Sequence, residues 1–230
     1  LYFGIEVNQP LKNAYFYIIM KYLLCCFLCI SFGVLSQNKG RSLKNIERLN
    51  NRIKITVSDG EYYISAFTKK ILECSFIPNG EKQKVNSHAI NAIPSQHLTL
   101  MVNKLRKVAY ISSGEIMVKV DFSPFKLTYL RDGIELISER WGYEKEGNIE
   151  KIQFNLDKNE LLYGGGARAL GMNRRGYRLA LYNRAHYGYE EKSELMNYTL
   201  PMILSSKRYA IHFDNSQIGT LDLDSKGDNT

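Results

Sequence analysis

The sequence predicts an all-β protein, built as a large antiparallel β-sandwich. Short segments in which apolar and polar residues alternate recur along the chain, and turn residues separate them. Apolar spacing typical of a helix is confined to a weak example near residues 43–49. About a dozen strands exceed the number in an immunoglobulin domain, and strands do not alternate with helices as a parallel sheet requires.

The expected strands follow one another from residue 52 and are rich in β-branched and aromatic residues. A three-stranded meander comes first, and a polar loop separates it from three further strands. These six strands cover residues 52–57, 61–67, 71–77, 97–103, 107–112 and 115–121. Later strands are expected in the segments IEKIQFNL, ELLYGG, YRLALYN, NYTLPMILS and RYAIHFDN.

A β-hairpin over residues 125–138, FKLTYLRDGIELIS, is the clearest local prediction. Asp132 and Gly133 lie between two alternating runs, and they suit a type I′ turn, which requires positive φ at both central residues. Strict alternation in the second strand places three residues on one face and two on the other, namely Ile134, Leu136 and Ser138 against Glu135 and Ile137.

An export signal is predicted at residues 20–36. Met20 and Lys21 precede an apolar run over residues 22–35, and small or polar residues follow it. The run is too short to cross a bilayer comfortably, so we expect a secreted or periplasmic protein with no stable membrane span. A membrane anchor over residues 15–35 is the alternative, which Lys21 interrupts. We expect residues 1–19 to be non-native sequence translated from upstream of the true start codon. A signal peptide at 20–36, a polar linker at 37–50 and the sandwich at 51–230 follow it.

The composition argues against several kinds of site. The net charge is +8, but 31 Lys and Arg residues are scattered among 23 Asp and Glu residues, so no nucleic-acid partner is expected. Three of the four cysteines lie in the apolar run, which leaves Cys74 without a partner for a disulfide or a multi-cysteine zinc site. The four histidines are irregularly spaced, so we expect neither a metal nor a cofactor.

A glycine cluster, YGGGARALG, begins at Tyr163. Gly164, Gly166 and Ala169 fit the dinucleotide-binding pattern G-x-G-x-x-G/A, in which a helix must follow the glycines. Residues 172–189 contain RRG, YN and YGY, which are not typical of a helix. The cluster is therefore interpreted as a strand end and a tight turn that leads into the following loop.

Residues 173–198 concentrate the side chains best suited to bind a ligand. Five tyrosines lie within this stretch, together with Asn173, Arg174, Arg175, Arg178, Asn183, Arg184 and His186. Aromatic faces can cover the apolar side of a pyranose while Arg, Asn and His reach its hydroxyls. The same residue types could stack RNA bases, or they could pack the rim of the sandwich against another domain.

The order of several motifs resembles the order found in a known protein family. LLYGGGARALGMNRRGYRLALYNRAHYGY, followed by MNYTLPMILSSKRYAIHFDNS, is similar to the N-terminal sandwich of glycoside hydrolase family 31, the α-glucosidase and α-xylosidase family. The shared order is Y-G-x-G, N-R-R-G, an aromatic and Asn loop, Y-x-x-P, S-S-K-x-Y and F-D-N. The likeness extends loosely over residues 50–225, and it implies a galactose mutarotase-like sandwich, truncated before a (β/α)8 barrel.

The resemblance implies retaining chemistry on α-glucosides, in which one aspartate attacks the anomeric carbon and another acts as acid and base. Both aspartates lie on the barrel, which needs roughly 250 residues of its own. No catalytic residue is therefore expected in this chain, and the fragment alone is expected to be inactive. A narrower resemblance is to secreted bacterial members that act on α-glucans, including transglucosylases that move 4-linked glucosyl units. One departure is Ala167, where the family usually carries Glu.

The resemblance also implies a site. A loop of the family's sandwich reaches over the barrel mouth, which implies an oligosaccharide or α-glucan as ligand and the C-terminal catalytic barrel as partner. The matching substrate-binding residues are Asn183, Arg184, His186, Tyr187 and Tyr189, with Asn173, Arg174 and Arg175 at the loop or domain contact. Three alternatives stay open: a free-standing carbohydrate-binding module, a mutarotase-like epimerase with a paired His and carboxylate, and a domain that only supports barrel folding.

The export signal yields a direct prediction. We expect the mature protein to begin near Ser36, because the small and polar residues that follow the apolar run are typical of a cleavage site. N-terminal sequencing of the secreted protein checks this. A mature chain that still begins at Leu1 would contradict it.

Overall fold

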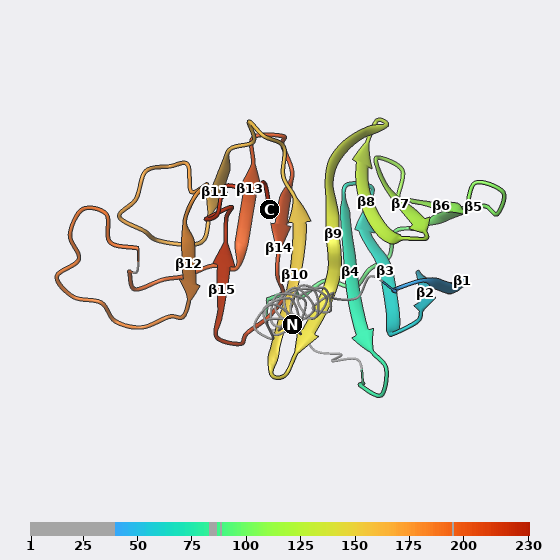
Figure 1. Ribbon diagram of the computed structural model, residues 1–230, viewed down its shortest axis with the longest axis horizontal. Helices are drawn as coiled ribbons and strands as arrows, with labels where there is room; N and C mark the ends of the chain where they lie inside the picture. The colour runs from blue at the N-terminus through green and yellow to red at the C-terminus, as the bar shows by residue number, and fades with distance from the viewer. Residues whose placement is uncertain (1–39, 83–86, 88, 195) are drawn as a thin grey trace, which may run out of the picture. The chain divides into compact units, whose positions relative to one another are not determined.

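The computed structural model describes residues 40–82, 87, 89–194 and 196–230. The predicted signal peptide and the upstream segment lie outside these residues. Every regular element in the described part is a β-strand, and every strand pair is antiparallel (Figure 1). The predicted all-β, antiparallel class is confirmed.

The first half of the described chain forms two antiparallel sheets. Strands β1 to β4 follow one another in a meander: β1 (Leu43–Leu49), β2 (Arg52–Val57), β3 (Gly60–Thr68) and β4 (Ile71–Pro78). A second sheet has six strands in the order β10-β9-β8-β7-β6-β5, so each strand lies beside its neighbour in sequence. Its members are β5 (Thr99–Asn103), β6 (Val108–Ser112), β7 (Ile116–Phe122), β8 (Phe125–Arg131), β9 (Ile134–Glu146) and β10 (Ile149–Asn155).

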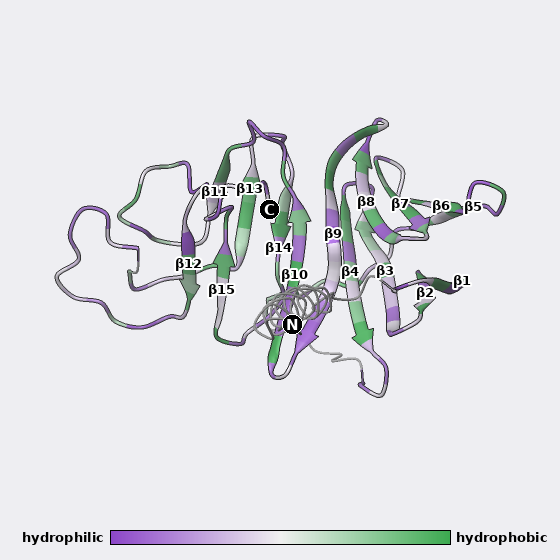
Figure 2. Ribbon diagram, viewed as in Figure 1, coloured by the Kyte–Doolittle hydropathy of each residue, from purple (hydrophilic) through white to green (hydrophobic). Residues whose placement is uncertain are grey.

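The two sheets share one hydrophobic core, to which each contributes the inward face of its strands. On β2 every second residue is buried, because alternate side chains in a strand point to the same face. Apolar residues recur along the strands of both sheets (Figure 2). Complete burial of one aliphatic side chain contributes about 1.5–3 kcal/mol. The residues of this core that are fully buried include Ile53, Ile55, Ile64, Ile111, Val118, Val120 and Leu127.

The second half of the chain has shorter strands and a separate core. The strands are β11 (Leu162–Gly164), β12 (Arg178–Leu181), β13 (Met202–Ser205), β14 (Ala210–His212) and β15 (Gly219–Asp222). They pair as one sheet in the order β11-β13-β14 and as a two-stranded ribbon of β12 and β15. The core joins both sheets through Leu162, Leu179, Ile203, Leu221 and Leu223.

Strand β1 differs from the sequence prediction, which placed a weak helical period and a polar linker here. Leu43, Ile46 and Leu49 are half-buried and the residues between them are exposed, so the burial repeats every third residue. The strand nevertheless pairs with β2, and its register shifts between Leu43 and Asn45. An irregular edge strand therefore produces spacing that resembles a helix, and the sandwich begins before residue 51.

The predicted hairpin is present, but its second strand does not alternate as expected. Asp132 and Gly133 have φ of 53° and 77°, as the predicted turn requires. Tyr129 pairs with Ile137 and Leu130 with Glu135, so Leu136 is an extra residue in β9. Because of this bulge, Leu136, Ile137 and Ser138 are all buried, and the alternation predicted for residues 134–138 is wrong.

A buried polar cluster lies at the end of the first core. Arg41 donates to both carboxylate oxygens of Asp59, at 2.8 and 2.6 Å, and to the hydroxyl of Tyr62, at 2.8 Å. Glu139 is 2% exposed, and its Oε2 accepts a 3.4 Å hydrogen bond from Tyr62. Its Oε1 has no partner among the described residues. Gly142 leaves the space for this cluster, because a Cβ there would lie 2.5 Å from Arg41 Nη1.

Burial raises the pKa of Glu139 to about 7, although the charge of Arg41 and the hydrogen bond from Tyr62 act in the opposite direction. The native state therefore holds a proton that the unfolded chain releases above its ordinary pKa of 4.5. The protonated carboxyl of Glu139 therefore contributes to the free energy of unfolding. This contribution is complete below pH 4.5 and is lost as the pH rises through about 7. The full difference is on the order of 3 kcal/mol.

We expect Glu139→Gln to remove most of the fall in the free energy of unfolding as the pH rises from 4.5 through about 7, because the amide carries no titrating proton. Urea unfolding at several pH values between 4.5 and 8 measures the effect as the free energy of unfolding. Glu135→Gln is the matched control, since Glu135 is exposed on the same strand. A Glu139→Gln variant with the same pH slope as the wild type would show that Glu139 is not the titrating group.

Candidate functional site

The glycine cluster forms the turn that ends β11. Gly164, Gly165 and Gly166 have φ of 113°, 77° and 90°, a region that other residues rarely adopt. A Cβ at Gly164 would overlap the carbonyl oxygen of Met202, and one at Gly166 would lie 2.6 Å from Thr199 Cα. The glycines therefore serve a close backbone approach. No helix follows them within the described residues, which excludes the dinucleotide-binding arrangement.

Arg168 holds three separate backbone segments around this turn. Its guanidinium donates to the carbonyl oxygens of Gly165 (3.2 and 3.0 Å), Ala180 (2.7 Å) and Glu194 (2.5 Å). Burial lowers the pKa of Arg168, and the charge of Arg174 lowers it further. Arg168 was not predicted from the sequence, because its three acceptors are backbone atoms that leave no side-chain motif.

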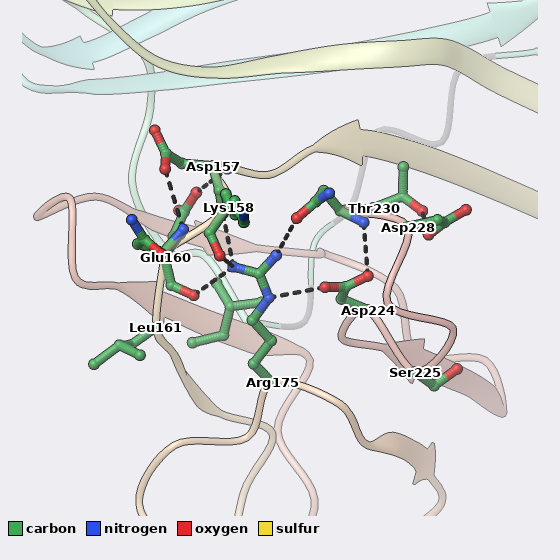
Figure 3. Close-up of polar contacts among 12 residues, drawn as sticks. Asp157, Lys158, Glu160, Leu161, Arg175, Asp224, Ser225, Asp228 and Thr230 are labelled. Atoms are coloured by element: carbon green, nitrogen blue, oxygen red, sulfur yellow. Dashed lines mark hydrogen bonds and ion pairs between the residues drawn. The ribbon is translucent and has the colours of Figure 1, made fainter.

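Arg175 connects the turn before β11 with the segment after β15, as Figure 3 shows. Its Nε donates to Asp224 Oδ2 at 2.8 Å, and both side chains are largely buried. Its Nη1 donates to the carbonyl oxygens of Asp157, Lys158 and Glu160 at 2.6, 3.1 and 2.8 Å. Its Nη2 donates to Asn229 Oδ1 at 2.7 Å. One side chain thus fixes two segments, residues 157–160 and 224–229, that are far from each other in sequence.

The other two residues expected at the loop or domain contact also bind backbone. Asn173 Oδ1 accepts from the backbone N–H groups of Leu162, at 3.2 Å, and Arg175, at 3.1 Å. Arg174 is buried and donates to the carbonyl oxygen of Gly171 at 2.5 Å. These contacts lie within the second half of the sandwich, and the role of the three residues at a contact with another domain stays a prediction.

A buried carboxylate organises the neighbouring strands. Glu160 is 2% exposed and accepts hydrogen bonds from the hydroxyls of Ser205 and Tyr209, the latter at 2.5 Å. Its other oxygen accepts from the backbone N–H of Asp157 at 3.0 Å. Burial and its hydrogen bond to Glu160 raise the pKa of Tyr209. Glu160 therefore links the turn that Arg175 binds to the turn between β13 and β14.

The predicted substrate-binding loop, residues 183–189, is held at two points. Asn183 Oδ1 accepts from the backbone N–H and the hydroxyl of Thr199, at 2.6 and 2.8 Å. The backbone N–H of His186 donates to Asn197 Oδ1 at 2.7 Å. The structure therefore fixes the beginning and the middle of this loop against residues 197–199.

Three predicted residues of this loop are exposed. Arg184, Tyr187 and Tyr189 make no hydrogen bond or ion pair within the described residues, and Tyr187 is 89% exposed. The structure does not bring these three side chains together into one pocket. Their role in binding a substrate stays a prediction.

A shallow groove of about 420 Å³ lies beside the start of this loop. It continues from the end of β12 to the segment between β14 and β15. Asn183 is the only predicted substrate-binding residue that lines it. Asn215, which ends the F-D-N motif, and Gln217 were not predicted as site residues, because their place beside Asn183 depends on strand pairing. The lining residues are Leu181, Tyr182, Asn183, Thr199, Pro201, Asn215, Ser216, Gln217 and Ile218.

Other kinds of site find no support in the described part of the chain. It contains no group of three or more His, Cys, Asp and Glu side chains that could hold a metal ion. It contains no helix long and apolar enough to cross a membrane. In this part neither His186 nor His212 forms an ion pair with a carboxylate, which a mutarotase-like reaction would need.

Comparison with protein families decides the class. The family model of the glycosyl hydrolase 31 N-terminal galactose mutarotase-like domain matches residues 61–222. The chain belongs to this family. The resemblance inferred from the order of the motifs is confirmed, and so is the galactose mutarotase-like fold of this family 31 domain.

Solved enzyme structures, two of which are described as family 31 enzymes, share this fold. A dextranase from Flavobacterium johnsoniae, complexed with glucose, has a TM-score of 0.76 at 18% identity over 83% of this chain. The cycloalternan-forming enzyme from Listeria monocytogenes, in complex with a pentasaccharide substrate, has a TM-score of 0.65 at 17% identity over 81% of it. An α-xylosidase from a soil metagenome, complexed with xylose, has a TM-score of 0.65 at 16% identity over 79% of it.

The family 31 chain spans only part of these enzymes. The alignment covers 24% of the dextranase, 18% of the cycloalternan-forming enzyme and 29% of the α-xylosidase. The comparison with curated proteins gives no match.

The contacts of Arg175 predict a large effect on stability. We expect Arg175→Ala to lower the free energy of unfolding by about 3 kcal/mol or more, because it leaves the buried carboxylate of Asp224 without its partner. Arg175→Lys should restore only part of the loss, since a lysine cannot bind several acceptors with a planar fork. Chemical denaturation measures both. Arg178→Ala is the control, because Arg178 is exposed on β12, and equal losses in the two alanine variants would contradict the prediction.

Proposed function

We propose that this chain is the N-terminal sandwich of a secreted, retaining α-glycosidase that acts on α-glucosides. Membership of family 31 is the observation that carries the proposal. The apolar run at residues 22–35 supports secretion. The transfer of 4-linked glucosyl units to an acceptor is the narrower form of the proposal, and the order of the motifs supports it.

In this proposal the two catalytic carboxylates lie on a (β/α)8 barrel of the same polypeptide. One carboxylate attacks the anomeric carbon and forms a glycosyl-enzyme, while the other protonates the leaving oxygen and then activates water or an acceptor hydroxyl. The sandwich supplies neither group. Its role is to present the loop of residues 183–189 at the substrate entrance. The hydrogen bonds of Asn183 and His186 support this role because they limit the conformations that the loop can adopt.

The test uses the enzyme encoded by the complete reading frame that contains this chain. We expect it to cleave maltotriose or isomaltotriose and to release the first sugar with its α configuration retained. Nuclear magnetic resonance of the anomeric protons during the first minutes of the reaction checks both points. Activity on β-linked substrates alone, or release of the inverted anomer, would overturn the proposal.

The loop predicts a defect in catalysis without a defect in folding. We expect His186→Ala and Tyr187→Ala each to lower kcat/KM of the full-length enzyme by about fivefold or more, because the loop side chains would contact the bound oligosaccharide. His97→Ala is the control, since His97 is exposed and lies beside the first core. If both loop variants stay within twofold of the wild type, the loop contributes packing alone.

A further inference from the structure

None of the residues that line the groove beside Asn183 is charged. The chain as a whole has a net charge of +8, and residues 184–194 next to the groove contain several charged side chains. An uncharged groove offers nothing to neutralise a phosphate or a carboxylate, so its chemistry suits a neutral ligand. Its volume of about 420 Å³ lies within the usual range of small-molecule sites, about 300–1,000 Å³.

Two amide groups in the groove are oriented by the backbone. Asn183 Oδ1 accepts two hydrogen bonds from Thr199, which identifies that atom as the oxygen and leaves the NH₂ group as the free end. Asn215 Oδ1 accepts from the backbone N–H of Gln217 at 2.9 Å, and its NH₂ group is again the free end. Neither NH₂ group donates to another described residue. The groove therefore holds two donors in fixed positions.

Apolar side chains complete the lining. Tyr182 is 45% exposed and Ile218 is 76% exposed, although both line the groove. A pyranose has an apolar face of C–H groups and a rim of hydroxyls, which act as both donors and acceptors. An aromatic ring beside fixed amides matches both parts of such a ring.

We propose that this groove binds a pyranosyl unit of a neutral α-glucan. Asn183 and Asn215 donate hydrogen bonds to its hydroxyl oxygens, and Tyr182 and Ile218 cover its apolar face. The assignment to a neutral oligosaccharide comes from the groove itself. The assignment to an α-glucan rests on the proposed function.

The test is a titration of the 230-residue chain with maltotriose and isomaltotriose, with cellotriose as the β-linked comparison. We expect the side-chain NH₂ resonances of Asn183 and Asn215 to shift with an α-linked trisaccharide. Asn183→Asp and Asn215→Asp keep the oxygen that accepts the backbone N–H and remove the free donor, so each should weaken binding at least fivefold. Tyr182→Ala should weaken it comparably, because it removes the apolar wall without changing either amide.

The matched control is Asn103→Asp. Asn103 Oδ1 accepts from the backbone N–H of Arg106 at 3.0 Å in an exposed turn after β5, so this variant makes the same chemical change in a similar turn. We expect its affinity to stay within twofold of the wild type. An equal loss of affinity in this control, or no shift with any trisaccharide, would overturn the proposed site.

Two further results separate this inference from the proposed function. If the full-length enzyme cleaves α-glucosides and the groove amides do not shift, the groove assignment is wrong while the proposed function stands. A shift with cellotriose alone would overturn the α-glucan assignment.

Discussion

The second half of this protein depends on arginine side chains that satisfy backbone carbonyl groups. Its strands have only three or four residues, so long stretches of backbone lack the hydrogen bonds of a sheet. A buried carbonyl without a donor costs about 1–3 kcal/mol. Arg168 and Arg175 together donate to six backbone carbonyls, four of them in buried or partly buried contacts, and each guanidinium offers five N–H groups in a fixed plane. These side chains perform the task that paired strands perform in the first half.

Regular parts of the fold were predictable from the sequence because their causes are local. Alternation predicts β2, and Asp132-Gly133 predicts the turn of the hairpin, since both signals act over a few residues. The bulge at Leu136 was not predictable, because it depends on how Tyr129 and Leu130 pair across the sheet. The ribbon strand β15 was missed for a similar reason, since it is short and pairs with β12 about forty residues earlier.

The candidate site could likewise be predicted only where its causes are local in sequence. The composition of residues 173–198 and the order of the motifs led to the family and to the loop. The acceptors of Arg175 at residues 157–160 could not be inferred, because a guanidinium that binds backbone carbonyl oxygens places no demand on the residue types there. The groove was also missed, since Asn215 reaches Asn183 only through the fold.

The three consecutive glycines after Tyr163 have a consequence for classification. Their φ values exclude a Cβ for reasons that do not involve any ligand, as does the close approach of residues 198–203 to Gly164 and Gly166 and of Leu179 to Gly165. The Y-G-G-G run therefore reports the architecture of the domain and carries no information about sugar or linkage. Relatives grouped by this run are therefore grouped by a backbone turn. Subfamilies with a common substrate are better sought in the uncharged residues at the end of β12 and before β15, where side chains rather than backbone decide the contacts.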